Sequence, residues 1–169
     1  YCRSVQKVKD YIAAGDIFQA NLTQRFSCPL EIDPWHLYLR LRLVNPAPFA
    51  AYLHYPELDV VSASPERFLR VRGPFVETRP IKGTRPRGRD PEEDMRLQNE
   101  LLQSEKDRAE LTMIIDLERN DLGKVCSYGS VHVPELICLE KYATVFHLVS
   151  TVRGVLAPDR DLVDLLCAT

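Results

Sequence analysis

The chain has 169 residues, of which 45% are hydrophobic, and its formal net charge is −2 at pH 7. No stretch approaches the roughly 20 apolar residues that a membrane-spanning helix needs. The near balance of charge argues against a nucleic-acid partner, because domains that bind polyanions usually carry a large basic excess. We therefore expect a soluble globular protein with its own hydrophobic core and with no nucleic acid or membrane as partner.

The number and spacing of the five cysteines indicate the cellular compartment of the protein. They form no CxxC pair or other spacing typical of metal ligands, and their odd number does not fit a disulfide framework. We therefore expect reduced thiols in a cytoplasmic protein.

The N-terminal part predicts two helices and one strand. Residues 4–14 have apolar side chains at helical spacing up to Gly15, a common helix end. Residues 18–22 alternate apolar and polar side chains, which predicts a strand. Asp33 has the chemistry of an N-cap, and it precedes a proline and an apolar helical face over residues 34–44.

The middle of the chain changes to short β-like runs. Between Phe49 and Thr84 these runs are separated by proline, glycine and aspartate, which favour turns. This pattern of short strands and turns predicts an antiparallel meander. The predicted strands are residues 51–55, 60–64, 68–72 and 75–79.

The last part returns to helices and then to strands. Asp90-Pro91 has the chemistry of a helix start, and Ser104 with Asp107 resembles a capping box that begins a helix running to Leu122. Together the elements predict an α+β fold, with helices packed on antiparallel β-sheet. The last two predicted strands are residues 131–139 and 146–156.

One lysine lies beside a glycine at the end of a predicted strand. In the segment from Pro80 to Gly88, the Lys82 amine could project into a cleft, and the Gly83 and Thr84 amides could approach a ligand closely. A solvated basic loop explains the same residues. A phosphate-binding loop fits these residues less well, because the spacing GxxxxGK[ST] is absent and no helix is predicted to begin directly after Thr84.

Two side chains could transfer protons. Pro65 restricts the backbone before Glu66, so this carboxylate leaves the bend in a fixed direction and could act as a general acid. The alternative is a turn glutamate paired with Arg67 or Arg70. His147 lies in an apolar run, where a core histidine satisfied by one hydrogen bond is usually a better interpretation than a catalytic one.

Two carboxylates have the spacing of a possible cation site. Asp107 and Glu110 are three residues apart on a predicted helix, so they leave the same face and could bind Mg²⁺ through oxygen. The alternatives are that Asp107 only completes the capping box and that Glu110 pairs with Lys106.

Together these segments resemble one family, the chorismate-utilising enzymes, which include anthranilate, isochorismate, salicylate and aminodeoxychorismate synthases. The resemblance runs through nearly the whole chain. It rests on a series of motifs in order: AGDIFQ at 14–19, NPAP at 45–48, SPERF at 64–68, RPIKGT at 79–84, SEKDRAE at 104–110, DLERNDLG at 116–123 and HLVSTV at 147–152.

The resemblance implies a fold, a substrate and site residues. Members of the family have an α/β sandwich built on antiparallel sheets, use chorismate and require Mg²⁺. By position, Glu66 matches the general acid, Gly83 and Thr84 match the substrate-binding turn, Asp107 and Glu110 match magnesium ligands, and His147 matches an active-site histidine.

Lys82 distinguishes branches within the family. In the segment that corresponds to residues 80–84, anthranilate synthases have a sequence similar to PIAGT. Enzymes that aminate chorismate at C4 have a sequence similar to PIKGT there and use the lysine as a nucleophile. The resemblance thus implies C4 amination for para-aminobenzoate and folate synthesis, with ammonia supplied by a glutamine amidotransferase subunit or domain. Anthranilate synthesis is one alternative, and a non-catalytic module that docks a partner subunit is another.

The resemblance also sets an expectation for the domain. Relatives continue with further motifs and a second pair of magnesium-binding glutamates, and they have an N-terminal subdomain. We therefore expect residues 1–169 to be a partial chorismate-binding catalytic domain, truncated at the C-terminus and catalytically incomplete alone.

Overall fold

The computed structural model describes residues 1–169 and confirms the α+β class, with helices packed on antiparallel sheet. None of the helices is both long and apolar enough to cross a membrane. The helices are α1 (Cys2–Ala14), α2 (Pro34–Val44), α3 (Pro91–Gln103), α4 (Glu105–Gly123) and α5 (Leu162–Ala168). The strands are β1 (Phe49–His54), β2 (Asp59–Ser64), β3 (Arg67–Arg72), β4 (Phe75–Arg79), β5 (Ile81–Pro86), β6 (His132–Lys141) and β7 (Val145–Val155).

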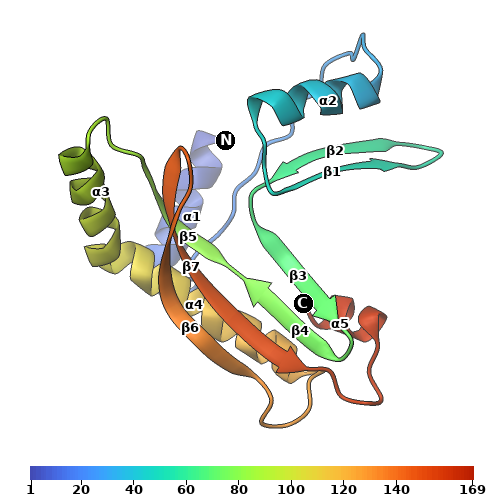
Figure 1. Ribbon diagram of the computed structural model, residues 1–169, viewed down its shortest axis with the longest axis vertical. Helices are drawn as coiled ribbons and strands as arrows, with labels where there is room; N and C mark the ends of the chain where they lie inside the picture. The colour runs from blue at the N-terminus through green and yellow to red at the C-terminus, as the bar shows by residue number, and fades with distance from the viewer.

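Two sheets organise the molecule. β1 and β2 form a hairpin that carries α2, and this lobe stands away from the larger sheet (Figure 1). The larger sheet contains the other five strands, and α4 runs behind it in the view of Figure 1. The sites described below belong to the larger sheet.

Side chains cap the helices where the sequence predicts. Asp33 Oδ1 accepts a hydrogen bond from the Trp35 N–H at 2.9 Å. Asp90 Oδ1 accepts one from the Glu93 N–H at 2.8 Å. Ser104 Oγ accepts from the Asp107 N–H at 3.3 Å, but the Asp107 carboxylate pairs with Arg85 instead of returning to the N-cap. Only half of the predicted capping box therefore forms.

The strand predicted over residues 18–22 is wrong. These residues have no regular secondary structure, and Phe18 is 92% exposed. Three alternating side chains form a short signal, and the segment has no neighbouring strand to complete its backbone hydrogen bonds.

The predicted meander is correct only for its two hairpins. β1 pairs with β2 and β3 with β4, whereas β4 and β5 lie end to end along one edge of β7, with Pro80 between them. The Pro80 carbonyl accepts a hydrogen bond from the Ser150 N–H at 3.1 Å, so β7 remains connected across the break. Because proline has no N–H, it interrupts the strand at a point where the chain changes partner residues. β5 was therefore missed as a strand.

One face of β7 forms the centre of the hydrophobic core. Phe146, Leu148 and Val152 are fully buried at alternating positions, as expected for one face of a strand. No residue before Val76 is buried, so the core belongs to the larger sheet and the helices behind it. The helices contribute Leu101 from α3, Leu111, Ile115 and Leu122 from α4, and Leu165 from α5.

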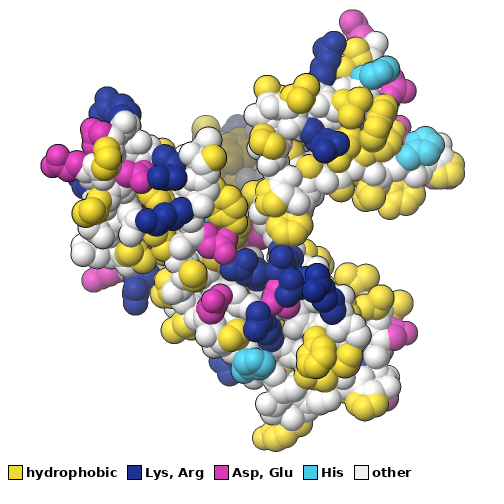
Figure 2. All heavy atoms as spheres, viewed as in Figure 1, with side chains coloured by type: hydrophobic (Ala, Val, Ile, Leu, Met, Phe, Trp, Pro, Cys, Tyr) yellow, Lys and Arg dark blue, Asp and Glu magenta, His cyan; other side chains and the backbone are white.

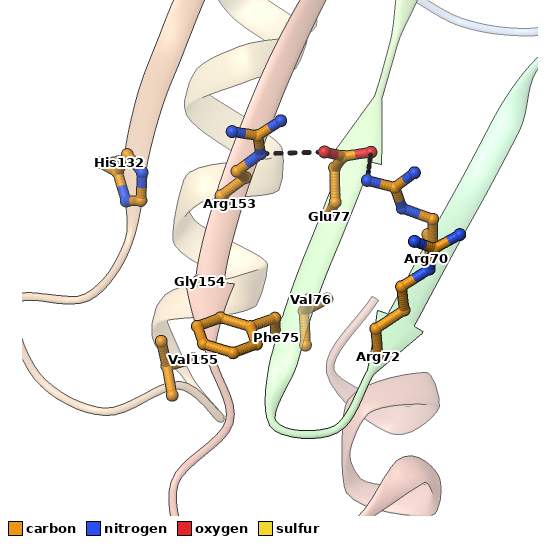
Figure 3. Close-up of a pocket in the computed structure, with 9 residues that line it drawn as sticks. All are labelled: Arg70, Arg72, Phe75, Val76, Glu77, His132, Arg153, Gly154 and Val155. Carbon is orange, nitrogen blue, oxygen red and sulfur yellow. Dashed lines mark hydrogen bonds and ion pairs between the residues drawn. The ribbon is translucent and has the colours of Figure 1, made fainter.

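The other face of the sheet is polar and basic. Figure 2 shows Lys and Arg side chains gathered over β3, β4 and β7. Glu77, which is only 5% exposed, pairs with Arg67 at 2.5 Å, Arg70 at 2.9 Å and Arg153 at 2.9 Å, the last two shown in Figure 3. Burial alone would raise the pKa of Glu77, but the Arg153 hydrogen bond and the neighbouring guanidiniums outweigh it and hold this pKa below its ordinary value.

A bulge at Gly83 brings the sheet close to α4. The register of β5 against β7 shifts between Lys82 and Thr84, and Gly83 has a φ of 78°. A Cβ on Gly83 would lie 2.8 Å from Asp107 Cβ and 2.9 Å from Leu101 Cδ1. Glycine is therefore required here both for the left-handed backbone and for the close approach of the helices.

Replacing Glu77 by glutamine should lower the free energy of unfolding by about 2 kcal/mol at neutral pH, because three guanidiniums lose their buried carboxylate. Since the folded-state pKa lies below the ordinary 4.5, this stabilisation is present above that pH and is lost as the pH falls further. Urea denaturation of the Glu77→Gln variant at successively lower pH measures both effects. Glu92→Gln, at an exposed position of α3, is the control. An equal loss at every pH would contradict the ion-pair explanation.

Replacing Gly83 by alanine should cost about 3 kcal/mol, because the methyl group adds a clash with α4 to the unfavourable φ. Gly129→Ala provides the matched control, since Gly129 has a φ of 77° and no atom within 4 Å of the added Cβ. That variant should cost only about 1 kcal/mol. Thermal unfolding of both variants separates the two contributions, and equal costs would show that α4 yields freely to the added methyl group.

Candidate active site

The bulge sends neighbouring side chains of β5 to opposite faces of the sheet. In a regular strand Lys82 and Thr84 would share one face. Lys82 instead pairs with Leu148, which lies in the core on the α4 side, and Thr84 pairs with His147 on the open side. Because directly paired residues point the same way, the Lys82 amine lies on the helix side and the Thr84 hydroxyl on the open side.

Glu66 lies beside the junction of β4 and β5. Its Oε1 accepts a hydrogen bond of 2.6 Å from the Ile81 N–H, next to Lys82 in the chain. β3 begins only at Arg67, so this edge N–H has no strand partner and the carboxylate takes its place. The alternative pairing of Glu66 with Arg67 or Arg70 is wrong, because both arginines bind Glu77.

His147 belongs to the open face. Its Nδ1 and Thr84 Oγ1 are hydrogen-bonded at 2.9 Å, and its ring packs edge-on against Tyr142 with 5.4 Å between ring centroids. Burial lowers the pKa of His147 below its ordinary value, against the opposing influence of Gly83 and nearby acids, so the imidazole is neutral at physiological pH. A neutral imidazole can accept one hydrogen bond and donate another.

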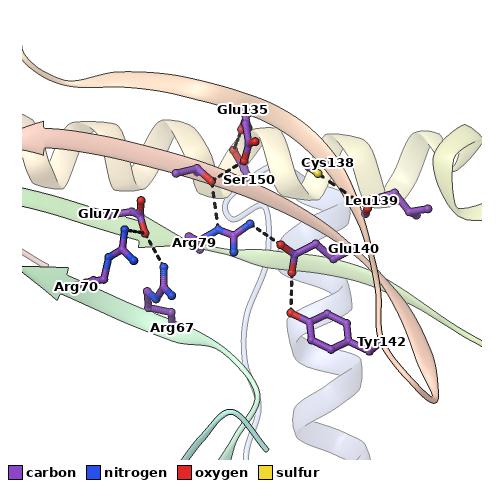
Figure 4. A network of polar contacts seen from close by, with 11 residues as sticks. Arg67, Arg70, Glu77, Arg79, Glu135, Cys138, Leu139, Glu140, Tyr142 and Ser150 are labelled. Carbon is purple, nitrogen blue, oxygen red and sulfur yellow. Dashed lines mark hydrogen bonds and ion pairs between the residues drawn. The ribbon is translucent and has the colours of Figure 1, made fainter.

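An arginine network lies on the open face and includes Tyr142, the ring partner of His147 (Figure 4). Arg79 donates to Glu140 Oε1 at 2.6 Å and to Thr151 Oγ1 at 3.2 Å, while the Tyr142 hydroxyl donates to Glu140 Oε2 at 2.6 Å. A cavity of about 170 Å³ is lined by Arg79, Glu140, Tyr142 and Ile81. Sequence reasoning missed Glu140 and Tyr142, because only the pairing of β6 with β7 brings them to Arg79.

The two predicted magnesium ligands do not complete a metal site. Asp107 Oδ2 lies 3.3 Å from an Arg85 nitrogen, and Glu110 Oε1 lies 3.8 Å from the Lys106 amine, as one alternative expected. No group of three or more His, Cys, Asp or Glu side chains is arranged to hold a metal ion. The pair could therefore supply only part of the roughly six oxygens that Mg²⁺ requires.

A further carboxylate was missed by sequence reasoning. Glu118 lies on α4 at a position that continues the buried series Leu111, Ile115 and Leu122. Its Oε2 is buried without a hydrogen-bond partner, and burial raises the pKa of Glu118 to about 7. A charged residue within an apolar helical series was the available signal.

A larger cavity lies elsewhere on the open face. It has a volume of about 410 Å³ and is lined by Arg70, Arg72, Arg153, His132 and neighbours at the far ends of β4 and β7 (Figure 3). None of the predicted site residues lines either cavity. The smaller cavity is lined by Pro65 and Ile81, the chain neighbours of Glu66 and Lys82, and by Arg79, so it is the candidate site.

This junction combines complementary chemical groups. The imidazole of His147 and the guanidinium of Arg79 lie on the open face, and the amine of Lys82 lies on the helix face of the same edge strand, next in the chain to the N–H that Glu66 binds. An amine can add to carbon, a carboxyl group can protonate a leaving oxygen, and a guanidinium can hold a carboxylate. The arrangement fits addition and elimination on a small carboxylate-bearing molecule.

The chain is similar to known proteins throughout its length. Relatives include aminodeoxychorismate synthase component 1 of Bacillus subtilis, 49% identical over 99% of the chain and 36% of the relative. Anthranilate synthase component 1 of Thermus thermophilus is 52% identical over the same shares. The solved structure of anthranilate synthase component I from Streptococcus pneumoniae superposes with a TM-score of 0.85 and 36% identity, over 98% of the chain and 36% of that structure.

The chain thus spans about a third of the length of these relatives. The family model described as chorismate binding enzyme matches residues 1–169, which is the whole chain. Together with the identities near one half, this match shows that the chain belongs to the family of chorismate-binding enzymes.

Proposed function

We propose that this chain is part of an enzyme that aminates chorismate at C4 to give 4-amino-4-deoxychorismate. The observation that carries the proposal is the place of Lys82, on β5 between the N–H bound by Glu66 and the Gly83 bulge. Overall identity does not favour either activity, since 49% to an aminodeoxychorismate synthase and 52% to an anthranilate synthase are nearly equal. The lysine within PIKGT is the feature that favours C4 amination.

Two displacements would give the product with retained configuration. The Lys82 lone pair forms a bond to C2 of chorismate, both conjugated ring double bonds shift, and the C4–O bond breaks as Glu66 donates a proton to the leaving hydroxyl. Ammonia then forms a bond at C4, both double bonds return, and the bond from C2 to Lys82 breaks. Each step forms one carbon–nitrogen bond and breaks one bond to carbon, and water is the by-product.

Because β5 has no strand on its outer edge, the substrate would lie at this edge, within reach of Lys82 on one face and of the open-face side chains on the other. Arg79 is the cation of the smaller cavity nearest the β4–β5 junction and would bind a chorismate carboxylate. The Thr84 and His147 pair would supply hydrogen bonds to ring substituents, with His147 neutral because its pKa is lowered by burial. Gly83 would let the backbone approach the ligand closely.

The proposal includes a cation and a second protein. Asp107 and Glu110 would contribute oxygens to Mg²⁺, which would bind the substrate carboxylate when present. The ammonia would come from a glutamine amidotransferase subunit or domain, and the product would enter para-aminobenzoate and folate synthesis.

Anthranilate synthesis is the second candidate. It is favoured by the 0.85 TM-score to an anthranilate synthase component I and by the 52% identity to another. In that reaction ammonia adds at C2, and a nucleophilic lysine is not needed. Identification of the product formed from chorismate and ammonia separates the two candidates directly.

Substituting Lys82 provides the sharpest test. In a protein that spans the full length of the relatives, Lys82→Ala should reduce turnover by about 100-fold or more while leaving the apparent affinity for chorismate nearly unchanged. Lys82→Arg should not rescue turnover, because a guanidinium stays protonated and has no free lone pair. Rates with ammonia, together with mass spectrometry for a lysine adduct, give the measurement.

Lys7→Ala on α1 is the control and should retain full activity, because α1 has no buried residue and carries none of the site residues. Near-normal formation of aminodeoxychorismate by Lys82→Arg, with no adduct on the unsubstituted protein, would defeat the assignment of Lys82 as nucleophile.

Magnesium binding by the 169-residue chain should be weak, because Asp107 and Glu110 supply too few oxygens and both already face cations. Titration calorimetry should show no saturation at millimolar Mg²⁺, and Asp107→Asn with Glu110→Gln should remove the remaining heat. Tight binding of one ion per chain would contradict this expectation.

A further inference from the structure

Glu118 occupies a position where a purely structural helix would place an apolar residue. It faces the sheet from α4, and a cavity of about 160 Å³ beside it is lined by apolar side chains such as Phe68 and Leu69. The Thr78 hydroxyl is the polar group of the sheet that faces the carboxyl group, yet Oε2 accepts no hydrogen bond. An unpartnered carboxyl oxygen in such surroundings costs stability, so packing does not explain its presence.

The register of the sheet places Lys82 on the same side as Glu118. Thr78 pairs with Val152 and Lys82 pairs with Leu148, and both β7 partners are fully buried beneath α4. The Thr78 and Lys82 side chains therefore point toward the helix that carries Glu118. The hydroxyl group of Thr78 on β4 and the amine of Lys82 on β5 therefore face Glu118.

The charges around Glu118 come from each neighbouring element. Lys82 of β5 is the cation that acts on it, while Glu66 before β3 and Asp121 of α4 are the acids. Burial raises the pKa of Glu118 to about 7, both acids add to the shift, and Thr78 and Lys82 oppose it. A carboxylate that titrates near neutral pH is well matched to accept and return a proton.

We propose that Glu118 is the proton acceptor that converts the Lys82 ammonium into the free amine. This inference rests on the proposed function, in which Lys82 must lose a proton before it attacks. In the transfer, one N–H bond of Lys82 breaks, its electron pair stays on nitrogen, and an O–H bond forms at the open Oε2 of Glu118. When Lys82 departs from C2, the proton returns and the pair is restored.

The first test is a titration that does not depend on the reaction. In the 169-residue chain with ¹³C-labelled carboxyl groups, NMR should show Glu118 titrating near pH 7. Lys82→Met should raise this midpoint by about one pH unit, because the opposing ammonium is lost. Asp116→Asn, on the exposed side of the same helix, should leave it unchanged. An unchanged midpoint in Lys82→Met would overturn the proposal.

The second test measures turnover against pH in a protein that spans the full length of the relatives. Glu118→Gln should lower turnover at neutral pH by about 100-fold with little change in KM, and the loss should shrink as the pH rises, because hydroxide can then accept the proton in place of Glu118. Asp116→Asn should keep the original profile. A Glu118→Gln variant with unchanged turnover, or with a loss that is equal at every pH, would overturn the proposal.

The two tests also separate this inference from the proposed function. A Glu118 midpoint that shifts in Lys82→Met, found in a protein that makes anthranilate, would refute C4 amination and support the interaction of Glu118 with Lys82. A protein that makes aminodeoxychorismate but shows no coupling would support the function and refute the role of Glu118.

Discussion

The pairing of β7 with three strands is the constraint on which the rest of the structure depends. One edge of β7 binds β6, while its other edge is shared by β4 and β5 on either side of Pro80. One face of the same strand supplies the buried side chains that α4 covers. This single strand therefore fixes the position of the junction, of the bulge at Gly83 and of every side chain that meets there.

The two faces of the sheet shift the pKa values of their glutamates in opposite directions. On the open face, Glu77 and Glu140 are held as carboxylates because arginines outweigh the effect of burial, so their pKa values lie below the ordinary range. On the helix face, Glu118 has no arginine partner, and burial raises its pKa to about 7. The open face is thus suited to holding charge in place, and the helix face is suited to moving a proton.

Local patterns in the sequence predicted much of the fold. Asp33, Asp90 and Ser104 begin helices where their capping chemistry indicates, since a cap depends only on the next few residues. The strands from 49 to 79 were also expected nearly at their bounds. The α+β class followed from these elements, because their order and type are local properties.

Long-range pairing explains what the sequence did not predict. The sequence of β5 is typical of a loop, because proline and glycine interrupt it. Only its pairing with β7 makes this segment a strand. The register of this pairing places Lys82 and Thr84 on opposite faces of the sheet, which their closeness in the sequence did not indicate. Glu118 was missed because a single glutamate on a helix is usually solvated, and its burial depends on the sheet behind it.

The distribution of the core has a consequence for local stability. Every buried residue lies at or beyond Val76, so the first 75 positions add no buried residue to the core. Segments with few buried contacts open at a lower free-energy cost than the global unfolding of the core. Glu66 follows the β1–β2 lobe, which adds nothing to the core, and precedes β3, whose Leu69 and Val71 pack against it, so Glu66 lies at the boundary between two regions of different local stability. Fluctuations that release Glu66 can therefore occur while the strand that carries the amine stays folded.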